Sequence, residues 1–404
     1  MKILLITQYF YPENFKSNDI AFELTKKGHK VTVLTGLPNY PEGKIHKEYG
    51  FFNRRREHIN GVKIIRTLLI PRGKSGGIRL FINYFSWAIF ASHRAFILSF
   101  SEKFDLIIVH QPSPITQGFP ALIVKKIQRI PIYFWVLDLW PESLTSAGGI
   151  KNKYVLGFFS KMVKYIYNNS DKILISSKGF ESSILAKGDY EDKLIYFPNW
   201  AEDSIADGNK NYPIPNLPEG FKLVFAGNIG VSQDMENLMM AALELKAHSK
   251  IKFIIVGDGR SMSFVQKFIK EYELTENVLL LGKFPIEAMA TIFNQADGLL
   301  VTLKDELIFN LTIPAKIQAY MSTSKPLVAM INGEGSNLIN EVKCGFTAPA
   351  GDFKKLSKII MKLYNLNVAE RNNMGALGYQ YYKENFKMES CIENLNGIIL
   401  NNHS

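Results

Sequence analysis

The chain has 404 residues, of which 47% are hydrophobic, which is enough for two domains with separate cores. Its two cysteines, Cys344 and Cys391, and its seven scattered histidines have no disulfide or metal-binding spacing, so we expect neither kind of site. Residues 1–200 hold 28 Lys and Arg against 15 Asp and Glu, a net charge of +13, and the remainder carries −2. This basic half favours an anionic partner, either nucleic acid or a phospholipid surface, and a solvated basic surface is the alternative.

Short apolar runs alternate with helical stretches along the first 200 residues. The opening run, residues 3–6, is too short for a signal peptide, so we expect a cytosolic protein. A helix is expected to begin near Ser17, Asn18 and Asp19 and to end at Gly28. The runs predicted as strands are MKILLITQYF (1–10), KVTVLTG (30–36), DLIIVHQ (105–111), PIYFWVLD (131–138) and DKILISS (171–177).

A second series of alternating strands and helices follows residues 206–220. That segment is polar and rich in Pro, Gly and Asn, which predicts a linker. The strands of the second series are KLVFAGN (222–228), KFIIVGDG (252–259), VLLLGKF (278–284), GLLVTL (298–303) and PLVAMI (326–331). Alternating strands and helices predict an α/β protein with two Rossmann-like, doubly wound parallel-sheet domains facing a central cleft. We expect an N-terminal domain over 1–204, a C-terminal domain over 205–375, and a helix over 376–404 that packs back on the first domain.

Ligands in such sheets bind at the carboxyl ends of the strands, so the loops there are the candidate sites. Gly227 and Gly230 follow the first strand of the second series and could bring the backbone close to a phosphate. Arg260 follows the next strand, after Gly257, and could contact a phosphate through two nitrogens. A simple turn with a solvated arginine explains that second pattern about as well.

Residues 308–329 pose a sharper question, because Lys316 stands in the first turn of a predicted helix, where a cation is usually unfavourable. Pro314 is suited to the first helical position. The helix start, from Thr312 through Ile313 and Pro314 to Ala315, would offer free amides to an anion. With Lys316 and Arg260, this predicts a diphosphate site without metal. No P-loop motif and no GxGxxG after the first strand are present, which argues against a P-loop enzyme and an ordinary dehydrogenase.

In the first half, Asp138 and Glu142 stand at the end of a predicted strand with Trp140 between them. A carboxylate there can act as a general base or hold a sugar hydroxyl, and a tryptophan can stack on a sugar ring. Asp138 or Ser143 as a simple helix N-cap is the alternative. His110, after another strand, is a similar candidate.

Six motifs together resemble the bacterial glycosyltransferases of family 4, which have the GT-B fold. The chain looks most like the subgroup of WbuB-type L-fucosamine transferases of O-antigen and capsule assembly. The motifs are YFYPE (9–13), GHKVTVLTGLPNYPEGKI (28–45), DLWPES (138–143), FAGNIG (225–230), VGDGR (256–260) and IPAKIQAYMSTSKPLVA (313–329).

The resemblance implies a retaining transferase that needs no metal or other cofactor. It would move a sugar, such as an N-acetylated amino or deoxyamino hexose, from a UDP-sugar on the C-terminal domain to a polyprenyl-diphosphate-linked sugar on the N-terminal domain. It implies catalytic roles for Asp138, Glu142 and Lys316. The donor residues would be Gly227, Asn228, Gly230, Arg260, Lys283, Phe284, Thr312, Ile313, Pro314 and Ala315, with uracil near Lys283 and Phe284. The acceptor side would include Asn39, Tyr40, Pro41, His110 and Trp140.

The sequence departs from the family pattern at several positions. Two glutamates usual in the family are Leu311 and Ala319 here, and the usual basic pair is Asn228 and Gln233. We therefore expect Lys316 to replace the charge missing from that pair. These departures keep a catalytically degenerate, membrane-surface sugar- or nucleotide-binding protein open as an alternative.

Residues 78–100 are long enough to span a bilayer but include His93 and Arg94. A core helix, an interfacial helix and a true span all remain open. A basic cluster, Arg54, Arg55, Arg56, Arg72, Lys74 and Arg79, would meet anionic headgroups at the inner face of the plasma membrane, where we expect a peripheral protein.

Two other functions are alternatives. A UDP-sugar epimerase of the same fold would need no acceptor and would not require the PNYPEG and DLWPES motifs. Nucleic-acid binding would show steep salt dependence, but no signature of a nucleic-acid-binding module is present, so we expect no nucleic-acid partner.

Overall fold

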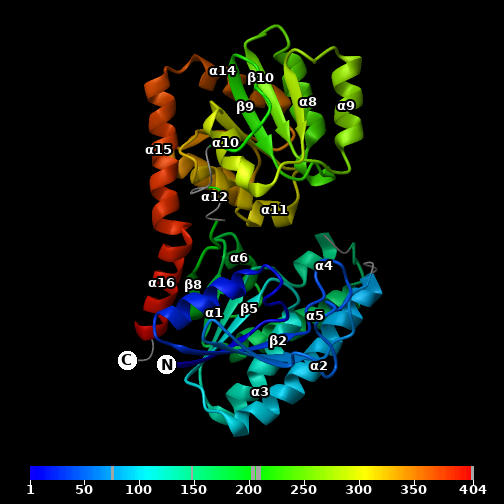
Figure 1. The fold of residues 1–404 in the computed structure, drawn as a ribbon, viewed down its shortest axis with the longest axis vertical. Coiled ribbons are helices and arrows are strands. Elements are labelled where there is room, and N and C mark those ends of the chain that lie inside the picture. The colour runs from blue at the N-terminus through cyan, green and yellow to red at the C-terminus, as the bar shows by residue number, and fades with distance from the viewer. Residues whose placement is uncertain (74–76, 147–148, 202–204, 206–210, 402–404) are drawn as a thin grey trace. The chain divides into compact units, whose positions relative to one another are not determined.

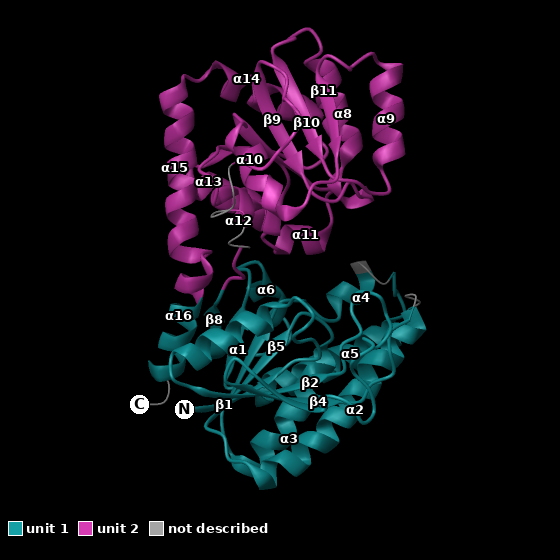
Figure 2. Cartoon of the chain, viewed as in Figure 1, with its two compact units in different colours: residues 1–197, 392–404 teal, residues 198–391 magenta. Residues whose placement is uncertain are grey.

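The computed structural model describes residues 1–73, 77–146, 149–201, 205 and 211–401. The chain divides into two compact units, residues 1–197 with 392–404 and residues 198–391 (Figure 2). Lys74 of the predicted basic cluster and residues 206–210 of the predicted linker lie outside the described part.

The first unit is built on an eight-stranded sheet with the order β3-β4-β2-β1-β5-β6-β7-β8 (Figure 1). Its neighbouring strands are parallel except for the antiparallel edge pair β3 and β4. The strands are β1 (Lys2–Ile6), β2 (Lys30–Gly36), β3 (Arg56–Ile59), β4 (Val62–Thr67), β5 (Leu106–Gln111), β6 (Ile132–Val136), β7 (Lys172–Ile175) and β8 (Leu194–Tyr196). The five predicted strands are confirmed, and β3, β4 and β8 were missed.

Helices cover both faces of this sheet. They are α1 (Lys16–Lys26), α2 (Gly77–Ser101), α3 (Gly118–Gln128), α4 (Glu142–Ser146), α5 (Lys153–Asn169) and α6 (Phe180–Leu185). Helix α3 packs against both α2 and α5 (Figure 1). Helix α1 begins at Lys16 with Phe15 as its N-cap, and it ends before Gly28, which has φ +89°.

Helix α2 contains the apolar segment that the sequence left open. One side of it is buried, through Trp87, Ala88, Ala91 and Ala95, whereas Ile89 is 67% exposed on another side. Within the described residues, no helix combines the length and the apolar character that a bilayer span requires. The segment is therefore a helix of the first unit with a partly exposed apolar surface.

The second unit contains a six-stranded parallel sheet with the order β11-β10-β9-β12-β13-β14. The strands are β9 (Phe221–Ala226), β10 (Ile251–Val256), β11 (Val278–Gly282), β12 (Gly298–Thr302), β13 (Leu327–Met330) and β14 (Gly345–Ala348). The helices are α8 (Met235–Glu244), α9 (Met262–Glu271), α10 (Met289–Asn294), α11 (Leu307–Leu311), α12 (Ala315–Met321), α13 (Gly333–Val342), α14 (Phe353–Asn365) and α15 (Val368–Asn385).

Alternate residues of these strands enter two hydrophobic clusters. Leu223 and Phe225 of β9 pack in one cluster, and Val224 and Ala226 pack in the other. This two-residue period is what a sheet covered on both faces requires, because successive side chains point to opposite faces. It explains the near-continuous apolar runs from which the strands were predicted.

The C-terminal region returns to the first unit. The single helix predicted over residues 376–404 is instead two helices in the described part of the chain, α15 and α16 (Met388–Asn401), because Phe386 ends the helical backbone of α15. Lys27 pairs with Glu393, and His29 Nε2 lies 2.7 Å from Asn396 Oδ1. These contacts join the last turns of the chain to the end of α1.

Each sheet has a point where the strand order reverses. It lies between β1 and β5 in the first unit and between β9 and β12 in the second. The carboxyl ends of strands on either side of such a point leave a crevice in which ligands bind. The predicted site residues of each unit follow strands at or near these points.

A buried ion pair gives a test of the first unit. Arg66 of β4 is fully buried, and its Nε donates a 2.8 Å hydrogen bond to Glu57 Oε2 of β3. We expect Glu57→Gln to lower the free energy of unfolding by about 3 kcal/mol, because it leaves the buried guanidinium without its counter-charge. Urea denaturation measures the loss. The control Glu48→Gln removes an exposed partner of Arg54 and should cost less than about 1 kcal/mol. Equal losses in the two variants would contradict the buried-pair argument.

Candidate active site

Two glycine loops meet at the carboxyl edge of the second sheet. Gly227 follows β9 with φ +130°, and Gly257 follows β10 with φ +135°. A Cβ on Gly257 would lie only 1.9 Å from the carbonyl oxygen of Gly227, so the two backbones approach as closely as glycine permits. The amide of Gly227 donates to Val256 O at 2.9 Å. This bond joins the two loops, and the predicted close approach of the Gly227 backbone to a phosphate stays a prediction.

Lys316 fills the space that Gly227 leaves. A Cβ on Gly227 would lie 2.9 Å from Lys316 Cε. The Lys316 ammonium donates a 2.5 Å hydrogen bond to Gln233 Oε1 and lies 3.6 Å from the centroid of the Phe225 ring. No salt bridge joins Lys316 to an acidic side chain within the described part of the chain. Its partners are therefore a neutral amide and an aromatic face.

This environment changes the charge expected for Lys316. Burial lowers its pKa from 10.5 to about 7, because removing the ammonium from water disfavours the charged form. The amine is therefore about half protonated at neutral pH, whereas the sequence predicted a full positive charge. An anion placed beside it would favour the protonated form and would gain a charge-assisted hydrogen bond.

The helix that carries Lys316 is short. Helix α12 begins at Ala315, one residue later than predicted, so Pro314 is its N-cap and not its first helical residue. The Thr312 hydroxyl donates to Ile308 O at 2.9 Å, within the preceding turn. Among the described residues, the backbone amides of Ala315 and Lys316 have no hydrogen-bond partner. Two donors are therefore available beside the Lys316 side chain, although seven residues make only a weak dipole.

The other predicted donor residues lie in neighbouring loops. Arg260 and Asn228 are exposed. Lys283 is also exposed and pairs with Asp258 at 3.3 Å, and Lys283 holds the pKa of that carboxyl below its usual range together with the Gly259 amide. Phe284 packs partly against the core. Ile313 does the same, so it supports the helix start by packing.

In the first unit, Asp138 lies just beyond the carboxyl end of β6. Its carboxylate accepts a hydrogen bond from Ser143 and one from Trp140 Nε1 at 2.9 Å. Burial raises its pKa, and the bonds from Ser143 and Trp140 oppose that rise. These donors are side chains, so the helix N-cap interpretation does not describe Asp138. It is a partly buried, oriented carboxylate at a strand end, as a sugar-hydroxyl acceptor requires.

Trp140 differs from its predicted role. It is only 3% exposed, and its ring packs edge-on against Phe159 at 5.2 Å between centroids. The ring is not available to stack on a sugar, so Trp140 is a positioning residue for Asp138.

Glu142 has structural partners. It forms a 2.5 Å ion pair with Lys187 and accepts a 2.6 Å hydrogen bond from Ser183. Glu142 thus ties α4 to α6, and its catalytic role stays a prediction.

Two predicted acceptor-side residues are also internal. His110 is 1% exposed, and burial lowers its pKa to about 3, so the ring is neutral. Its Nδ1 lies 3.3 Å from Thr7 Oγ1. Asn39 is fully buried and donates to Leu37 O at 3.1 Å, so it orders its own loop. Tyr40 and Pro41, in contrast, are exposed.

The structure adds residues that the sequence did not single out as site residues. Glu13 is buried and accepts the amides of Asn39 at 2.7 Å and Tyr40 at 2.6 Å, so it fixes the PNYPEG loop. The Arg72 guanidinium lies 5.1 Å from the centroid of the Tyr40 ring, and its charge lowers the pKa of Tyr84 against the effect of burial. Glu13 had a sequence signal in the YFYPE motif, and Arg72 had one only as a member of the predicted basic cluster.

Tyr84 of α2 connects this loop to Asp138. Its side chain interacts with Ser113, which also interacts with Asp138. The loops after β4, β5 and β6, together with α2, thus bring together a cation, two hydroxyls and a carboxylate. Within the described residues, no group of three His, Cys, Asp or Glu side chains is placed to hold a metal ion.

Comparisons with known proteins also indicate a glycosyltransferase. A family model described as glycosyl transferases group 1 matches residues 220–365, and one described as a glycosyl transferase 4-like domain matches residues 17–200. The chain is 26% identical over 288 residues to the probable glycosyltransferase WbjE of Pseudomonas aeruginosa, covering 68% of this chain and 70% of that protein. It is 25% identical over 320 residues to the putative colanic acid biosynthesis glycosyl transferase WcaI of Escherichia coli K12, covering 75% and 77%.

Solved structures share the fold. HepE of Anabaena in complex with UDP superposes with a TM-score of 0.69 at 13% identity, covering 99% of this chain and 100% of that one. At this identity the likeness concerns the fold.

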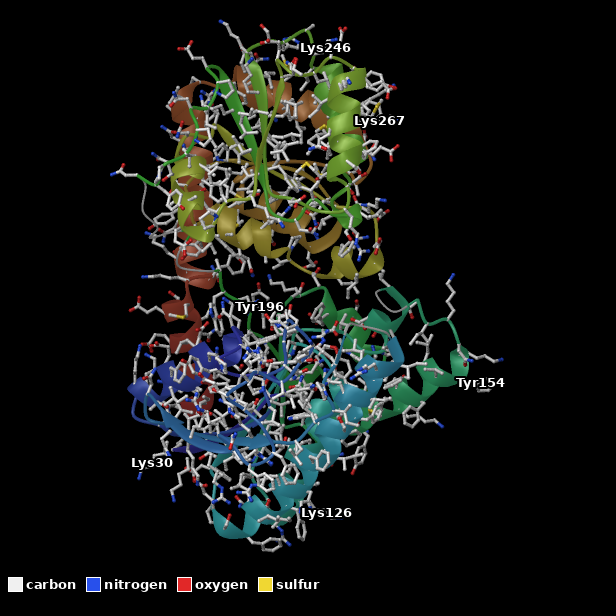
Figure 3. The ribbon with its side chains drawn as sticks, turned by 45° about the vertical axis from the view of Figure 1, so that its right-hand side comes forward. Lys30, Lys126, Tyr154, Tyr196, Lys246 and Lys267 are labelled. Atoms are coloured by element: carbon white, nitrogen blue, oxygen red, sulfur yellow. The ribbon has the colours of Figure 1, made fainter. Side chains whose placement is uncertain are left out.

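The buried amine of Lys316 predicts a pH dependence of stability. The unfolded chain holds this proton up to a pH near 10.5, whereas the folded protein releases it near 7. Between these values the unfolded state binds more protons, so the free energy of unfolding should rise with pH. Relative to Lys316→Met, the wild type should gain stability from pH 7 to 10 in urea denaturation. For Lys267→Met, at an exposed position on α9 (Figure 3), the free energy of unfolding should change with pH as it does in the wild type. Parallel curves for Lys316→Met as well would refute the lowered pKa.

Proposed function

Because the chain belongs to the glycosyltransferases of family 4 with the GT-B fold, as its motifs predicted, we propose a specific transfer for it. It moves a sugar, an N-acetylated amino or deoxyamino hexose, from a UDP-sugar to a polyprenyl-diphosphate-linked sugar. The anomeric configuration is retained and no metal takes part. Its place in polysaccharide biosynthesis accords with the curated relatives, one of which is named for colanic acid synthesis.

The observation that carries this proposal is the setting of Lys316. Its buried amine lies at the strand-order reversal of the second sheet, beside two free amides and without an acidic partner among the described residues. A nucleoside diphosphate supplies the anion that such a site lacks. The complex of HepE with UDP, a protein of the same fold, supports a nucleotide of this kind.

In the proposed reaction, the bond between the anomeric carbon and the diphosphate oxygen breaks, and its electron pair stays on UDP. Lys316 and the amides beside it neutralise the charge that develops, which fixed dipoles and cations do best in a site that excludes water. The acceptor hydroxyl forms the new bond to the anomeric carbon, and its proton passes to the departing diphosphate. Asp138 accepts a hydrogen bond from a sugar hydroxyl and orients it.

We also place the protein at the inner face of the plasma membrane, as a peripheral protein in the cytoplasm. The observation that supports membrane binding is not the basic cluster predicted from the sequence. Arg54 is paired with Glu48, and Arg55 donates to the carbonyl oxygens of Arg66 and Phe51. The apolar surface of α2 is the better candidate, with Ile78 80%, Ile89 67% and Phe100 67% exposed.

Neighbouring α5 extends this surface. Tyr154 is 78% exposed and Phe158 57% exposed, and Tyr154 is marked on this helix in Figure 3. Lys153 and Lys161 of the same helix are exposed or partly exposed. Apolar side chains among lysines suit a surface with anionic headgroups, where each nearby basic residue contributes about 1 kcal/mol.

The first test of the donor site is thermal stabilisation by UDP, GDP, ADP and dTDP at equal concentrations. UDP at 100 times its dissociation constant should stabilise the folded protein by about 2.7 kcal/mol, and the other nucleotides should stabilise it less. Lys316→Ala should lose most of this stabilisation and most of the turnover, whereas Lys267→Ala should keep both. Unchanged affinity in Lys316→Ala would remove Lys316 from the site. Conversion of a UDP-sugar to its epimer without acceptor would indicate a different reaction.

Vesicle sedimentation tests the membrane face. With vesicles of phosphatidylethanolamine and phosphatidylglycerol, the wild type should sediment at low salt and less at high salt. Ile78→Asp with Phe100→Asp should weaken this binding at least about tenfold, because each change places a charge among apolar side chains. Val368→Asp changes an equally exposed apolar residue on α15 and should have no effect. Equal loss in the control, or no sedimentation by the wild type, would contradict the assignment.

A further inference from the structure

An apolar groove lies on the first unit, outside the residues assigned to the donor and acceptor sites, and it shares Ile89 with the proposed membrane face. It has a volume of about 480 Å³ and is formed by α2, α3 and α5. Its α2 side consists of Phe85, Ala88, Ile89 and Ser92. Phe119 and Ile123 of α3 and Tyr165 of α5 also line it. The volume falls in the range of small-molecule sites, and the lining is mostly hydrocarbon and aromatic.

One end of the groove adjoins the candidate acceptor site. Helices α2, α3 and α5 each follow the carboxyl end of a strand, so all three begin at the edge of the sheet where Asp138 lies. Phe85 comes directly after Tyr84, whose side chain interacts with Ser113 beside Asp138. Phe85 also packs on Phe159 at 6.3 Å between centroids. Phe159 in turn packs on Trp140, the indole that donates to Asp138.

From this end the groove runs away from the site. Positions 85, 88, 89 and 92 lie along one side of α2 in the direction of its C-terminus, because residues three and four apart share a helix face. Lys126, in the last turn of α3, lies at the other end and is exposed (Figure 3). The 67% exposure of Ile89 shows that the groove is open along its length. A chain can therefore enter from the side.

The residues that line the groove determine which class of molecule can bind there. A sugar or nucleotide in this groove would leave hydroxyl and phosphate groups without partners, which is costly. A branched hydrocarbon chain would bury apolar surface against Phe85, Phe119 and Ile123 without such a loss. A cation also lies near the end of the groove that adjoins Asp138, because the charge of Arg72 opposes the rise in the pKa of Tyr84 that burial causes. Within the described residues, no salt bridge joins Arg72 to a carboxylate.

We infer that this groove holds the first part of the prenyl chain of the lipid-linked acceptor. Its diphosphate then faces Arg72, and the sugar attached to it reaches Asp138. The inference rests on the proposed function, since it assigns the lipid part of that acceptor to a place on the first unit. The acceptor would then bind the first unit through its prenyl chain as well as through its sugar.

Farnesyl diphosphate, a soluble prenyl diphosphate, tests this by isothermal titration calorimetry on the full chain without detergent. We expect it to bind at least tenfold more tightly than inorganic diphosphate. Ile89→Asp and Ser92→Trp should each weaken its binding at least tenfold, one by charge and one by filling the groove. Ile97→Asp is the matched control, because Ile97 is 41% exposed on the same helix but does not line the groove. It should bind as the wild type does.

Equal binding of inorganic and farnesyl diphosphate would overturn the inference, as would equal binding by all variants. A loss in Ile97→Asp as large as in Ile89→Asp would also overturn it, since it would indicate a general apolar surface. UDP stabilisation of each variant shows that the fold is intact. It also separates the two proposals. If UDP stabilises the protein but farnesyl diphosphate does not bind, only the assignment of the groove is wrong. If farnesyl diphosphate binds in the groove but UDP does not stabilise the protein, only the donor assignment is wrong.

Discussion

The close approach of two glycine loops in the second unit is the constraint on which the candidate donor site depends. Because Gly257 lies against the Gly227 carbonyl, and because Gly227 has no side chain, a lysine side chain fits beside β9. Lys316 then meets an aromatic ring and an amide oxygen, neither of which repays the cost of burying a charge. In the proposed function, the diphosphate of the donor supplies the anion that Lys316 lacks among the described residues.

Burial disfavours the charged form in the first unit as well, but there hydrogen bonds oppose the effect. Asp138 is an acid whose charged form is disfavoured by burial but supported by hydrogen bonds from Ser143 and Trp140. Its position is fixed by neighbours that do not touch a substrate, Trp140 through its indole and Phe159 through packing on that indole. Orientation therefore comes from buried aromatic groups, and these same groups form the wall between the carboxylate and the groove on α2 and α5.

The strands buried on both faces could be predicted because their residues are almost all apolar, as in β1 and β5. Strand β4 was missed because it contains Lys63 and Arg66, and the charge of Arg66 is compensated by Glu57 only after the edge pair forms. At the site, Lys316 was found because a cation in a first helical turn is unusual. Its lowered pKa could not be predicted, because it comes from burial of the amine by segments that are distant in the sequence, such as the strand that carries Phe225.

The α2 helix shows why composition alone left its role open. Ala88, Ala91 and Ala95 recur three and four residues apart and are buried, so the small side chains face the interior of the unit. Trp87, the largest side chain of the helix, is fully buried as well, whereas other large side chains such as Ile89 and Phe100 are exposed. One side of α2 therefore covers the sheet, and the other side leaves apolar side chains in solvent. The proposed prenyl chain and the proposed membrane surface would both cover that second side.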